Sequence, residues 1–330
     1  MYRTAEFVSP KHPDKICDRI SDKILDYCLT QDRDARVAVE TMGGHGHIYV
    51  NGEITIDSDK EIPVPHLVEE VLETSDLLRT TQVNIVKQSP EISRGVDKGG
   101  AGDQGIMVGY ACDDNDEYVP EEYRLARSLC RHLYDKFPYD GKTQVTTRDD
   151  RNLFVVTSFQ NVDKITLHKE VSEWLKGTDY GLMITHANPA GDWNQGGFDA
   201  DAGLTGRKLV VDNYGPRVPI GGGAYSGKDP SKVDRSAAYM ARHIAKKELI
   251  RKGLSECWVY LSYAIGEKEP LQMTCMDGYN NTWEIPSFYP VYPNEIIEFL
   301  DLKQPIYYET SQWGAYGNGF KWDKCYQENS

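Results

Sequence analysis

The stretch GGGAYSGKDPSKVDRSAAYMARHIAKKELIRKG, residues 221–253, predicts a glycine-rich loop that runs directly into a long amphipathic helix. Asp229 and Pro230 are typical of a helix start, as the N-cap and the first helical residue. Gly253 suits the position just past the helix end. Apolar residues at helical spacing predict one buried stripe, made of Val233, Ala237, Met240, Ala241 and Ile244.

The charge of this stretch indicates an anionic ligand. It carries eight Lys or Arg against three Asp or Glu, inside a chain whose formal net charge is −14. A glycine loop at a helix N-terminus also offers backbone N–H groups and the positive end of the helix dipole. We therefore expect a polyphosphate here, with a divalent cation beside Asp234. The other interpretation is a flexible turn before a helix whose basic face is only solvated.

The loop resembles a P-loop without matching it. Residues 222–228 fit the G-x-x-x-x-G-K frame, but Asp229 stands where a P-loop has Ser or Thr. The hydroxyl that would hold Mg²⁺ is therefore missing. The pattern favours a phosphate loop of another kind.

Composition limits the classes of function. The chain has 330 residues, 39% hydrophobic and 27% charged, as expected for a soluble globular protein of two or three domains. Its acidic balance argues against nucleic acid and membrane-surface partners. The seven scattered cysteines predict buried free thiols rather than disulfides or zinc ligands. With no apolar run near 18 residues and no leader-like segment, we expect a cytoplasmic protein.

A second group of polar residues stands at the predicted start of another helix. Pro13 suits the first helical position, so His12, Asp14 and Lys15 cluster at a helix N-terminus. This indicates another anion-facing site, with a carboxylate that could bind a metal. The alternative for His12 is a partly buried side chain with no chemical role.

Several strands are expected before and after these helices. The sequence predicts a strand at 35–40, a hairpin of strands 47–50 and 53–57 across Asn51-Gly52, and a strand at 209–212. A hairpin of strands 142–148 and 153–160 is also expected. Taken alone, Glu40 and Glu53 read as solvated residues at strand ends. The glycine-rich segments 88–105 and 188–208 are candidate binding loops or surface linkers.

Together these segments resemble the S-adenosylmethionine synthetases, or methionine adenosyltransferases. The resemblance covers most of the chain in ordered blocks: HPDK at 12–15, NGEIT at 51–55, KQSPEI at 87–92, GAGDQG at 100–105, KTQVT at 142–146, DAGLTGRK at 201–208 and GGGAYSGKDPSKVDRSAAY at 221–239.

The resemblance implies an α/β fold of three similar units with approximate threefold symmetry, over residues 1–96, 97–196 and 197–330. It implies a homodimer or a dimer of dimers, with sites between subunits. The implied reaction makes S-adenosylmethionine from ATP and L-methionine by attack of the sulfur on C5′. The triphosphate leaves and is hydrolysed to pyrophosphate and phosphate. Two Mg²⁺ ions and K⁺ are the implied cofactors.

Site residues are carried over by position. The implied catalytic residues are His12, Asp103, Lys142, Arg207 and Lys228. The implied ATP contacts are His12, Asp140, Lys142, Asp192, Trp193, Asp201, Arg207, Lys208, Ala224 and Lys228. The implied methionine contacts are Glu53, Gln88, Asp201 and Lys232. The implied metal ligands are Asp14 and Asp234 for magnesium and Glu40 for potassium.

The implied chemistry explains these residue types. A neutral thioether attacks without losing a proton, so the difficult part is the triphosphate, whose charge grows as it leaves. Fixed cations aimed at that charge are the expected device.

The chain departs from the family in a short loop before Gly100 and in Asp192, where a basic residue is common. The short loop motivates the alternative of a catalytically impaired, nucleotide-binding regulatory subunit; a P-loop kinase is a more distant one.

Overall fold

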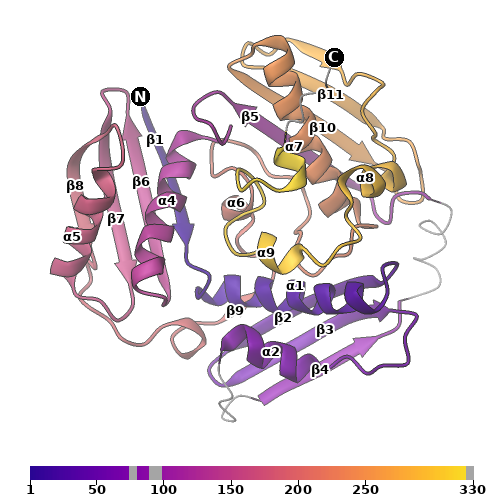
Figure 1. Ribbon diagram of the computed structural model, residues 1–330, viewed down its shortest axis with the longest axis horizontal. Coiled ribbons are helices and arrows are strands. Elements are labelled where there is room, and N and C mark those ends of the chain that lie inside the picture. The colour runs from indigo at the N-terminus through magenta and orange to yellow at the C-terminus, as the bar shows by residue number, and fades with distance from the viewer. Residues whose placement is uncertain (74–79, 89–98, 325–330) are drawn as a thin grey trace.

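The computed structural model describes residues 1–73, 80–88 and 99–324, and shows three four-stranded sheets with helices packed on them (Figure 1). This is the expected three-unit α/β fold. The first sheet has the order β1(Tyr2–Val8)-β6(Gly141–Arg148)-β7(Asn152–Phe159)-β8(Gly181–Ala187). The second has the order β12(Thr282–Glu284)-β11(Gln272–Asp277)-β10(Glu256–Tyr263)-β5(Gly105–Cys112). The third has the order β4(Thr80–Val86)-β3(His47–Thr55)-β2(Arg36–Gly44)-β9(Gly203–Leu204).

Each sheet contains a strand from a distant part of the chain. β1 pairs with β6, β5 pairs with β10, and β9 pairs with β2. The three units are therefore tied to one another by backbone hydrogen bonds. The boundaries 1–96, 97–196 and 197–330 stay a prediction.

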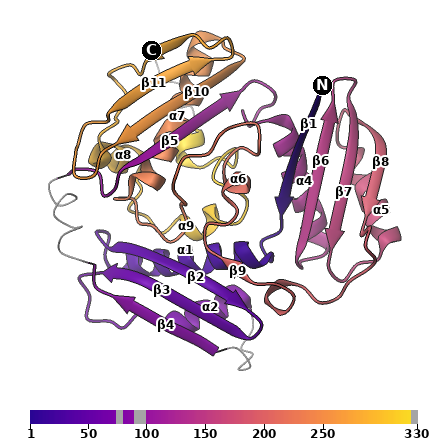
Figure 2. The same cartoon turned by 180° about the vertical axis from the view of Figure 1, so that it is seen from behind.

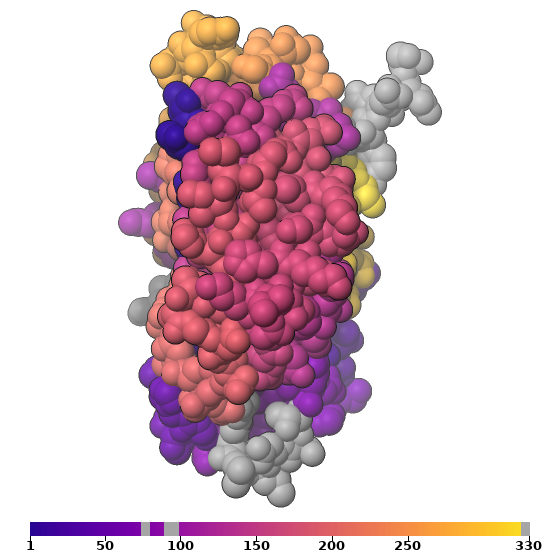
Figure 3. Space-filling view, turned by 90° about the vertical axis from the view of Figure 1, so that its left-hand side faces the viewer, coloured from indigo at the N-terminus to yellow at the C-terminus, as the bar shows by residue number. Residues whose placement is uncertain are grey.

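One long helix covers each sheet. α1(Pro13–Gln31) packs on β2 and β9, α4(Glu121–Lys136) on β1 and β6, and α7(Val233–Lys252) on β5 and β10. Figure 2 shows the β2–β4 and β5–β10–β11 sheets in front of α1 and α7. Edge-on, the molecule is much narrower than it is across this face (Figure 3). The remaining described helices are α2(Val64–Leu72), α5(Lys164–Leu175), α6(Leu209–Asp212), α8(Pro293–Leu300) and α9(Tyr307–Thr310), with 3₁₀ turns at Gly197–Asp199 and Lys321–Asp323.

The C-terminal part of the chain fills the centre between the units, where α6 and α9 lie (Figure 1). Aromatic rings pack there: Tyr214 stacks on Tyr316 at 4.5 Å and Tyr239 on Trp322 at 3.8 Å between ring centroids. All four side chains are buried. This aromatic packing joins α7 to the segments that flank α6 and α9.

The central helix is confirmed except for its start. All five residues of the predicted stripe are buried, and Gly253 ends the helix in the left-handed conformation at φ 62°. The helix begins at Val233 with Lys232 as N-cap, so the predicted start at Asp229 and Pro230 is wrong. Asp229 is used elsewhere. Its backbone N–H donates to the Val37 carbonyl at 3.0 Å and its carboxylate accepts from the Val37 N–H at 2.7 Å.

Two strand predictions are also wrong. Residues 47–55 form one strand, β3, and the turn before it is made by His45 and Gly46. Gly52 is needed because a Cβ there would lie 2.1 Å from the Ala38 carbonyl oxygen on the neighbouring strand. Residues 209–212 form the short helix α6 instead of a strand, because tertiary contacts override the β-branched preference of this segment. The hairpin at 141–159 is confirmed.

The cysteine prediction holds over the described residues. Six free, buried cysteines are present, Cys17, Cys28, Cys112, Cys130, Cys257 and Cys275. Cys325 lies outside the described residues. In the described part of the chain, no helix is both long and apolar enough to span a membrane.

Candidate functional site

The first group of candidate residues surrounds the N-terminus of α1, as the HPDK block predicts. His12 is the N-cap residue, and its Nδ1 accepts a hydrogen bond from the Asp14 N–H at 3.2 Å. The Asp14 carboxylate is buried and accepts from the Leu204 N–H at 3.0 Å and from Lys208 Nζ at 2.6 Å. Arg207 Nε lies 3.2 Å from the same carboxylate. Asp14 thus forms ion pairs with two neighbouring residues of one loop, Arg207 and Lys208.

The charge state of this group follows from its burial. Burial, together with the positive charge of Lys208, lowers the pKa of His12 to about 4, so the imidazole is neutral at pH 7. Since Nδ1 accepts a hydrogen bond, the proton is on Nε2. Burial alone would raise the pKa of Asp14, but hydrogen bonds from Lys208 and Leu204 outweigh it and the pKa is lowered. The carboxylate is therefore ionised.

Lys142 and Asp201 are part of the same group, since the charges of both act on His12. Lys142 forms an ion pair with Glu6 at 2.9 Å, and its side chain is about half exposed. Asp201 is exposed, and its carboxylate accepts a hydrogen bond from the Ala202 N–H at 2.8 Å. Both side chains therefore have charge turned toward solvent beside His12.

Asp140 lines a cleft of about 280 Å³ next to this group, together with Lys11, Gln160 and Phe198. Its carboxylate accepts from the Gly197 N–H at 2.9 Å, and burial raises its pKa to about 6. Trp193 stands at the edge of this region, where a Cβ on Gly196 would lie 2.9 Å from its ring.

The side chains of Asp192 and Trp193 differ in their hydrogen bonding. Asp192 accepts a hydrogen bond from the Lys164 N–H at 2.9 Å, at the start of α5. The carboxylate of Asp192 thus contacts the N-terminus of α5 and, among the described contacts, no cation of the site. The Trp193 indole N–H is buried and has no hydrogen-bond partner among the described residues.

The second group lies where the 224–228 loop meets β2. The Val39 N–H donates to the Gly227 carbonyl at 3.0 Å, so this loop pairs with the strand. Gly227 has φ 79°, and a Cβ there would lie 1.9 Å from the Val39 carbonyl oxygen, so no other residue fits. Lys228 follows directly, and its Nζ lies 2.5 Å from the Asp234 carboxylate.

The glycines of this region make room for Asp234. A Cβ on Gly223 would lie 2.1 Å from Asp234 Cγ, and one on Gly105 would lie 3.2 Å from Asp234 Oδ1. The GAGDQG and GGGAYSGK blocks therefore meet around one carboxylate. Asp103, two residues before β5, is exposed, and its carboxylate accepts a hydrogen bond from the Gln104 N–H at 2.7 Å.

Glu40 and Glu53 belong to the second group as well. In the register of β2 and β3, Glu40 opposes Asn51 and Ala38 opposes Glu53, so the two glutamates share a sheet face. Burial raises the pKa of Glu40, with Lys228 opposing and Glu53 adding to the shift. The prediction that they stand at strand ends is wrong, because Glu40 lies inside β2 and Glu53 inside β3, although the Glu40 side chain is exposed as predicted.

The remaining candidates lie close by. Lys232 forms an ion pair with Asp229 at the start of α7. Gln88 follows β4, and its N–H donates to Thr55 Oγ1 at 3.3 Å. Ala224 touches the first group, because a Cβ on Gly206 would lie 2.8 Å from the Ala224 Cβ. The two groups therefore meet where these loops pack together.

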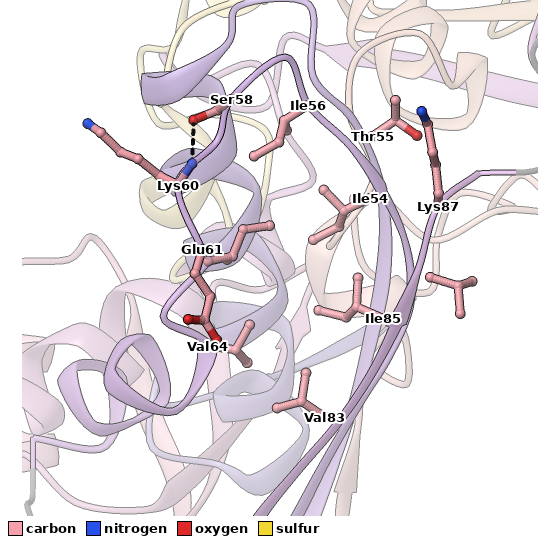
Figure 4. A pocket seen from close by; sticks show the side chains of 12 residues that line it. Ile54, Thr55, Ile56, Ser58, Lys60, Glu61, Val64, Val83, Ile85 and Lys87 are labelled. Carbon is pink, nitrogen blue, oxygen red and sulfur yellow. Dashed lines mark hydrogen bonds between the residues drawn. The ribbon is translucent and has the colours of Figure 1, made fainter.

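Another cleft, of about 520 Å³, lies between β3, β4 and residues 56–64 (Figure 4). Its described lining is mainly isoleucine and valine, with Lys60, Glu61 and Lys87 among the polar side chains. None of the candidate residues is among those described in its lining. The candidate residues are therefore concentrated at the loops of the two groups and not in this cleft.

Comparison with known proteins agrees with this geometry. Models of the N-terminal, central and C-terminal domains of S-adenosylmethionine synthetase match residues 1–96, 98–179 and 195–324. The chain belongs to the S-adenosylmethionine synthetase family.

Its relatives are similar over nearly their whole length. The chain is 38% identical to S-adenosylmethionine synthase 1 of Rhodospirillum rubrum over 370 positions, which cover 97% of this chain and 95% of that protein. It is 39% identical to the synthase of Sorangium cellulosum, over 97% and 87% of the two chains. It is 38% identical to that of Thermus thermophilus, over 97% and 95%. The alignments are longer than the chain, so these family members carry residues that it lacks.

Sequence reasoning missed the residues that hold the two cationic loops in place. Asp18 accepts from the Gly206 N–H and Asp22 from the Gly227 N–H, both at 2.8 Å. The spacing of Asp14, Asp18, Asp22 and Asp26 is one signal that would have found them, since acidic residues four apart repel on a solvated helix.

Proposed function

We propose that this family member synthesises S-adenosylmethionine from ATP and L-methionine. In the proposed reaction the methionine sulfur attacks C5′ of ATP, and the released triphosphate is hydrolysed to pyrophosphate and phosphate. One observation carries the proposal: Arg207, Lys208 and Lys228 are each held against a carboxylate of the site, Asp14 or Asp234.

Cations held in this way suit a leaving group that gains negative charge. They are placed before the reaction starts, so they cost no reorganisation when charge develops on the triphosphate. We assign triphosphate binding to Lys142, Arg207, Lys208 and Lys228 on this basis. His12 is neutral, and its Nε2–H can donate a hydrogen bond to the oxygen that leaves C5′.

The other contacts are proposed from position. We place the nucleotide beside Ala224, Asp201, Asp140 and the ring of Trp193; Asp140 supports this because it lines a cleft next to His12. We assign methionine contacts to Glu53, Gln88, Asp201 and Lys232, and place Asp103 near the reacting centre. Asp192 is assigned to the nucleotide from the resemblance alone, since its carboxylate accepts a hydrogen bond from the Lys164 N–H at the start of α5.

Magnesium fits these residues only together with a phosphate ligand. Among the described residues no group of three or more His, Cys, Asp or Glu side chains could hold a metal ion. Mg²⁺ is commonly bound by one or two carboxylates and substrate phosphates, which suits single carboxylates such as Asp14 and Asp234 beside lysines. Two Mg²⁺ ions would supply positive charge to the phosphates. K⁺ would be held by Glu40, which shares its sheet face with Glu53.

We also propose a homodimer, or a dimer of dimers, with sites between subunits. Met42 and Leu204 are neighbours on adjacent strands and are 52% and 38% exposed. They lie on the sheet face that also carries Glu40, so a second copy on this face would reach the second group of site residues. Exposed apolar side chains grouped on a sheet face are typical of a protein–protein interface.

Changing Met42 to glutamate is expected to dissociate the dimer, because a charge would be buried in an apolar interface. Sedimentation velocity on wild type should give the mass of two or four chains, and Met42→Glu mostly one chain. Ile165→Glu is the matched control, because Ile165 is 82% exposed on α5. A wild-type monomer, or an unchanged mass for Met42→Glu, would contradict this assembly.

Purified protein with ATP, L-methionine, Mg²⁺ and K⁺ is expected to give S-adenosylmethionine with equal amounts of pyrophosphate and phosphate, detected by mass spectrometry. Chelating Mg²⁺ should abolish product, since the phosphates lose their counter-charge. A strong tripolyphosphatase with no sulfonium product would contradict the proposal. ATP binding without product in a single turnover would favour the regulatory subunit, although the reported relatives all carry the name of the synthase.

A further inference from the structure

Four aspartates follow one face of α1 at intervals of one turn, and we call them the aspartate row. Each accepts hydrogen bonds from backbone N–H groups in the last 130 or so residues of the chain, at 2.8–3.0 Å. The pairs are Asp14 with Leu204, Asp18 with Gly206, Asp22 with Gly227, and Asp26 with Tyr307 and Tyr308. The N-terminal helix thus holds four separate points of the C-terminal part of the chain.

Asp18 holds the loop 203–208. Its Oδ1 accepts from the Gly206 N–H at 2.8 Å, and its Oδ2 accepts from Lys15 Nζ at 3.0 Å. Asp18 and Lys15 are both fully buried. Gly206 directly precedes Arg207 and Lys208, so Asp18 fixes the backbone from which two of the proposed triphosphate ligands extend.

Asp22 holds the loop 224–228 with the help of Arg235. The Gly227 N–H donates to Asp22 Oδ1 at 2.8 Å, and Arg235 donates to both oxygens of Asp22 at 2.8 and 2.7 Å. The same guanidinium donates to the Lys228 carbonyl at 3.0 Å. The backbone on both sides of the Lys228 side chain is therefore fixed by one buried ion pair.

The two loops are placed by one rigid element. Asp18 and Asp22 are one helical turn apart, so the pitch of α1, about 5.4 Å, sets the spacing of the points that they hold. The loops also touch each other at Gly206 and Ala224. A cation stabilises a developing charge best when it is already in place before the charge develops. An error of about 1 Å in its placement can lower the rate greatly.

We propose that Asp18 and Asp22 are positioning residues that set the relative placement of the two cationic loops, 203–208 and 224–228. The proposal rests on the proposed function, because it assigns these loops to the leaving triphosphate. Neither aspartate needs to touch substrate. Their effect passes through the backbone N–H groups of Gly206 and Gly227.

The row supplies its own control. Asp26 lies on the same helix face and also binds backbone N–H groups, but those of α9 and not of a cationic loop. Asp18→Asn, Asp22→Asn and Asp26→Asn keep the side-chain size and one acceptor oxygen. Each replaces one carboxylate oxygen of the row by an amide nitrogen, so a general loss of stability would appear in all three.

The test measures kcat, KM for methionine, and the dissociation constant of tripolyphosphate with Mg²⁺ by calorimetry, on folded protein well below its melting temperature. For Asp18→Asn and Asp22→Asn we expect about tenfold lower kcat and about tenfold weaker tripolyphosphate binding, with KM for methionine within about threefold. Asp26→Asn should stay within about twofold in all three. Equal losses in all three variants, or no loss in the first two, would overturn the proposal.

Wild type separates this proposal from the function itself. If wild type binds tripolyphosphate but makes no S-adenosylmethionine, the proposed function is contradicted. The positioning role of Asp18 and Asp22 is then tested by the dissociation constants of tripolyphosphate alone. If wild type does not bind tripolyphosphate, the positioning role fails too. Should Asp18→Asn and Asp22→Asn not fold, Arg235→Lys keeps the charge opposite Asp22 but loses the bidentate contact with Asp22 and the hydrogen bond to the Lys228 carbonyl. Unchanged kcat and tripolyphosphate binding in Arg235→Lys would then overturn it.

Discussion

Replacing Lys228 with alanine is expected to lower kcat by about 10²–10³-fold, the usual loss when one preorganised group at a developing charge is removed. Lys228 Nζ lies 2.5 Å from Asp234, on a loop that pairs with β2. The cation is therefore fixed before ATP binds, and the alanine variant has nothing to replace it. KM for methionine should change much less, because the lost contact is one to the triphosphate and not to methionine.

The measurement is steady-state production of S-adenosylmethionine with saturating ATP, methionine and Mg²⁺. Lys169→Ala is the control, since Lys169 is exposed on α5, and its kcat should equal that of wild type. Circular dichroism would show that Lys228→Ala keeps the fold. A kcat within about threefold of wild type would remove Lys228 from the set of triphosphate ligands.

Replacing Arg242 with methionine is expected to lower the free energy of unfolding by about 3–5 kcal/mol, because it leaves a buried charge without its partner. Arg242 is fully buried on α7, and its Nε donates to the Asp323 carboxylate at 2.9 Å. Its other nitrogens donate to the carbonyls of Tyr110, Tyr118 and Glu117 at 2.7–2.8 Å. One side chain thus donates hydrogen bonds to acceptors in β5, in the loop after it and in the C-terminal 3₁₀ turn.

Equilibrium urea unfolding at a fixed protein concentration measures this loss. Arg151→Met is the matched control, because its ion pair with Asp179 spans 4.0 Å between largely exposed side chains. Such surface ion pairs contribute little to the free energy of unfolding, so Arg151→Met should unfold at the same urea concentration as wild type. If Arg242→Met also unfolded at the wild-type urea concentration, the buried contacts of Arg242 would not be what joins α7 to the end of the chain.

Much of the candidate site was readable from the sequence. HPDK at a helix start, Lys228 on a glycine loop and Asp234 in the following turn all stand where the local pattern puts them. These signals are short-range: a cap, a proline and a glycine act within one turn of the chain. The chemical roles of these residues came from the resemblance, and they stay predictions until the variants are measured.

The sequence alone determined the buried stripe of α7, the start of α1, the hairpin at 141–159 and the positive charge near residues 207–232. Only the tertiary structure decided that Gly52 lies inside a strand, that residues 209–212 form a helix, and that aspartates of α1 hold loops 188 and 205 residues away. The physical reason is the range of the forces. Periodicity and caps are set by near neighbours, whereas a close backbone approach or a buried carboxylate is set by whatever distant segment packs against it.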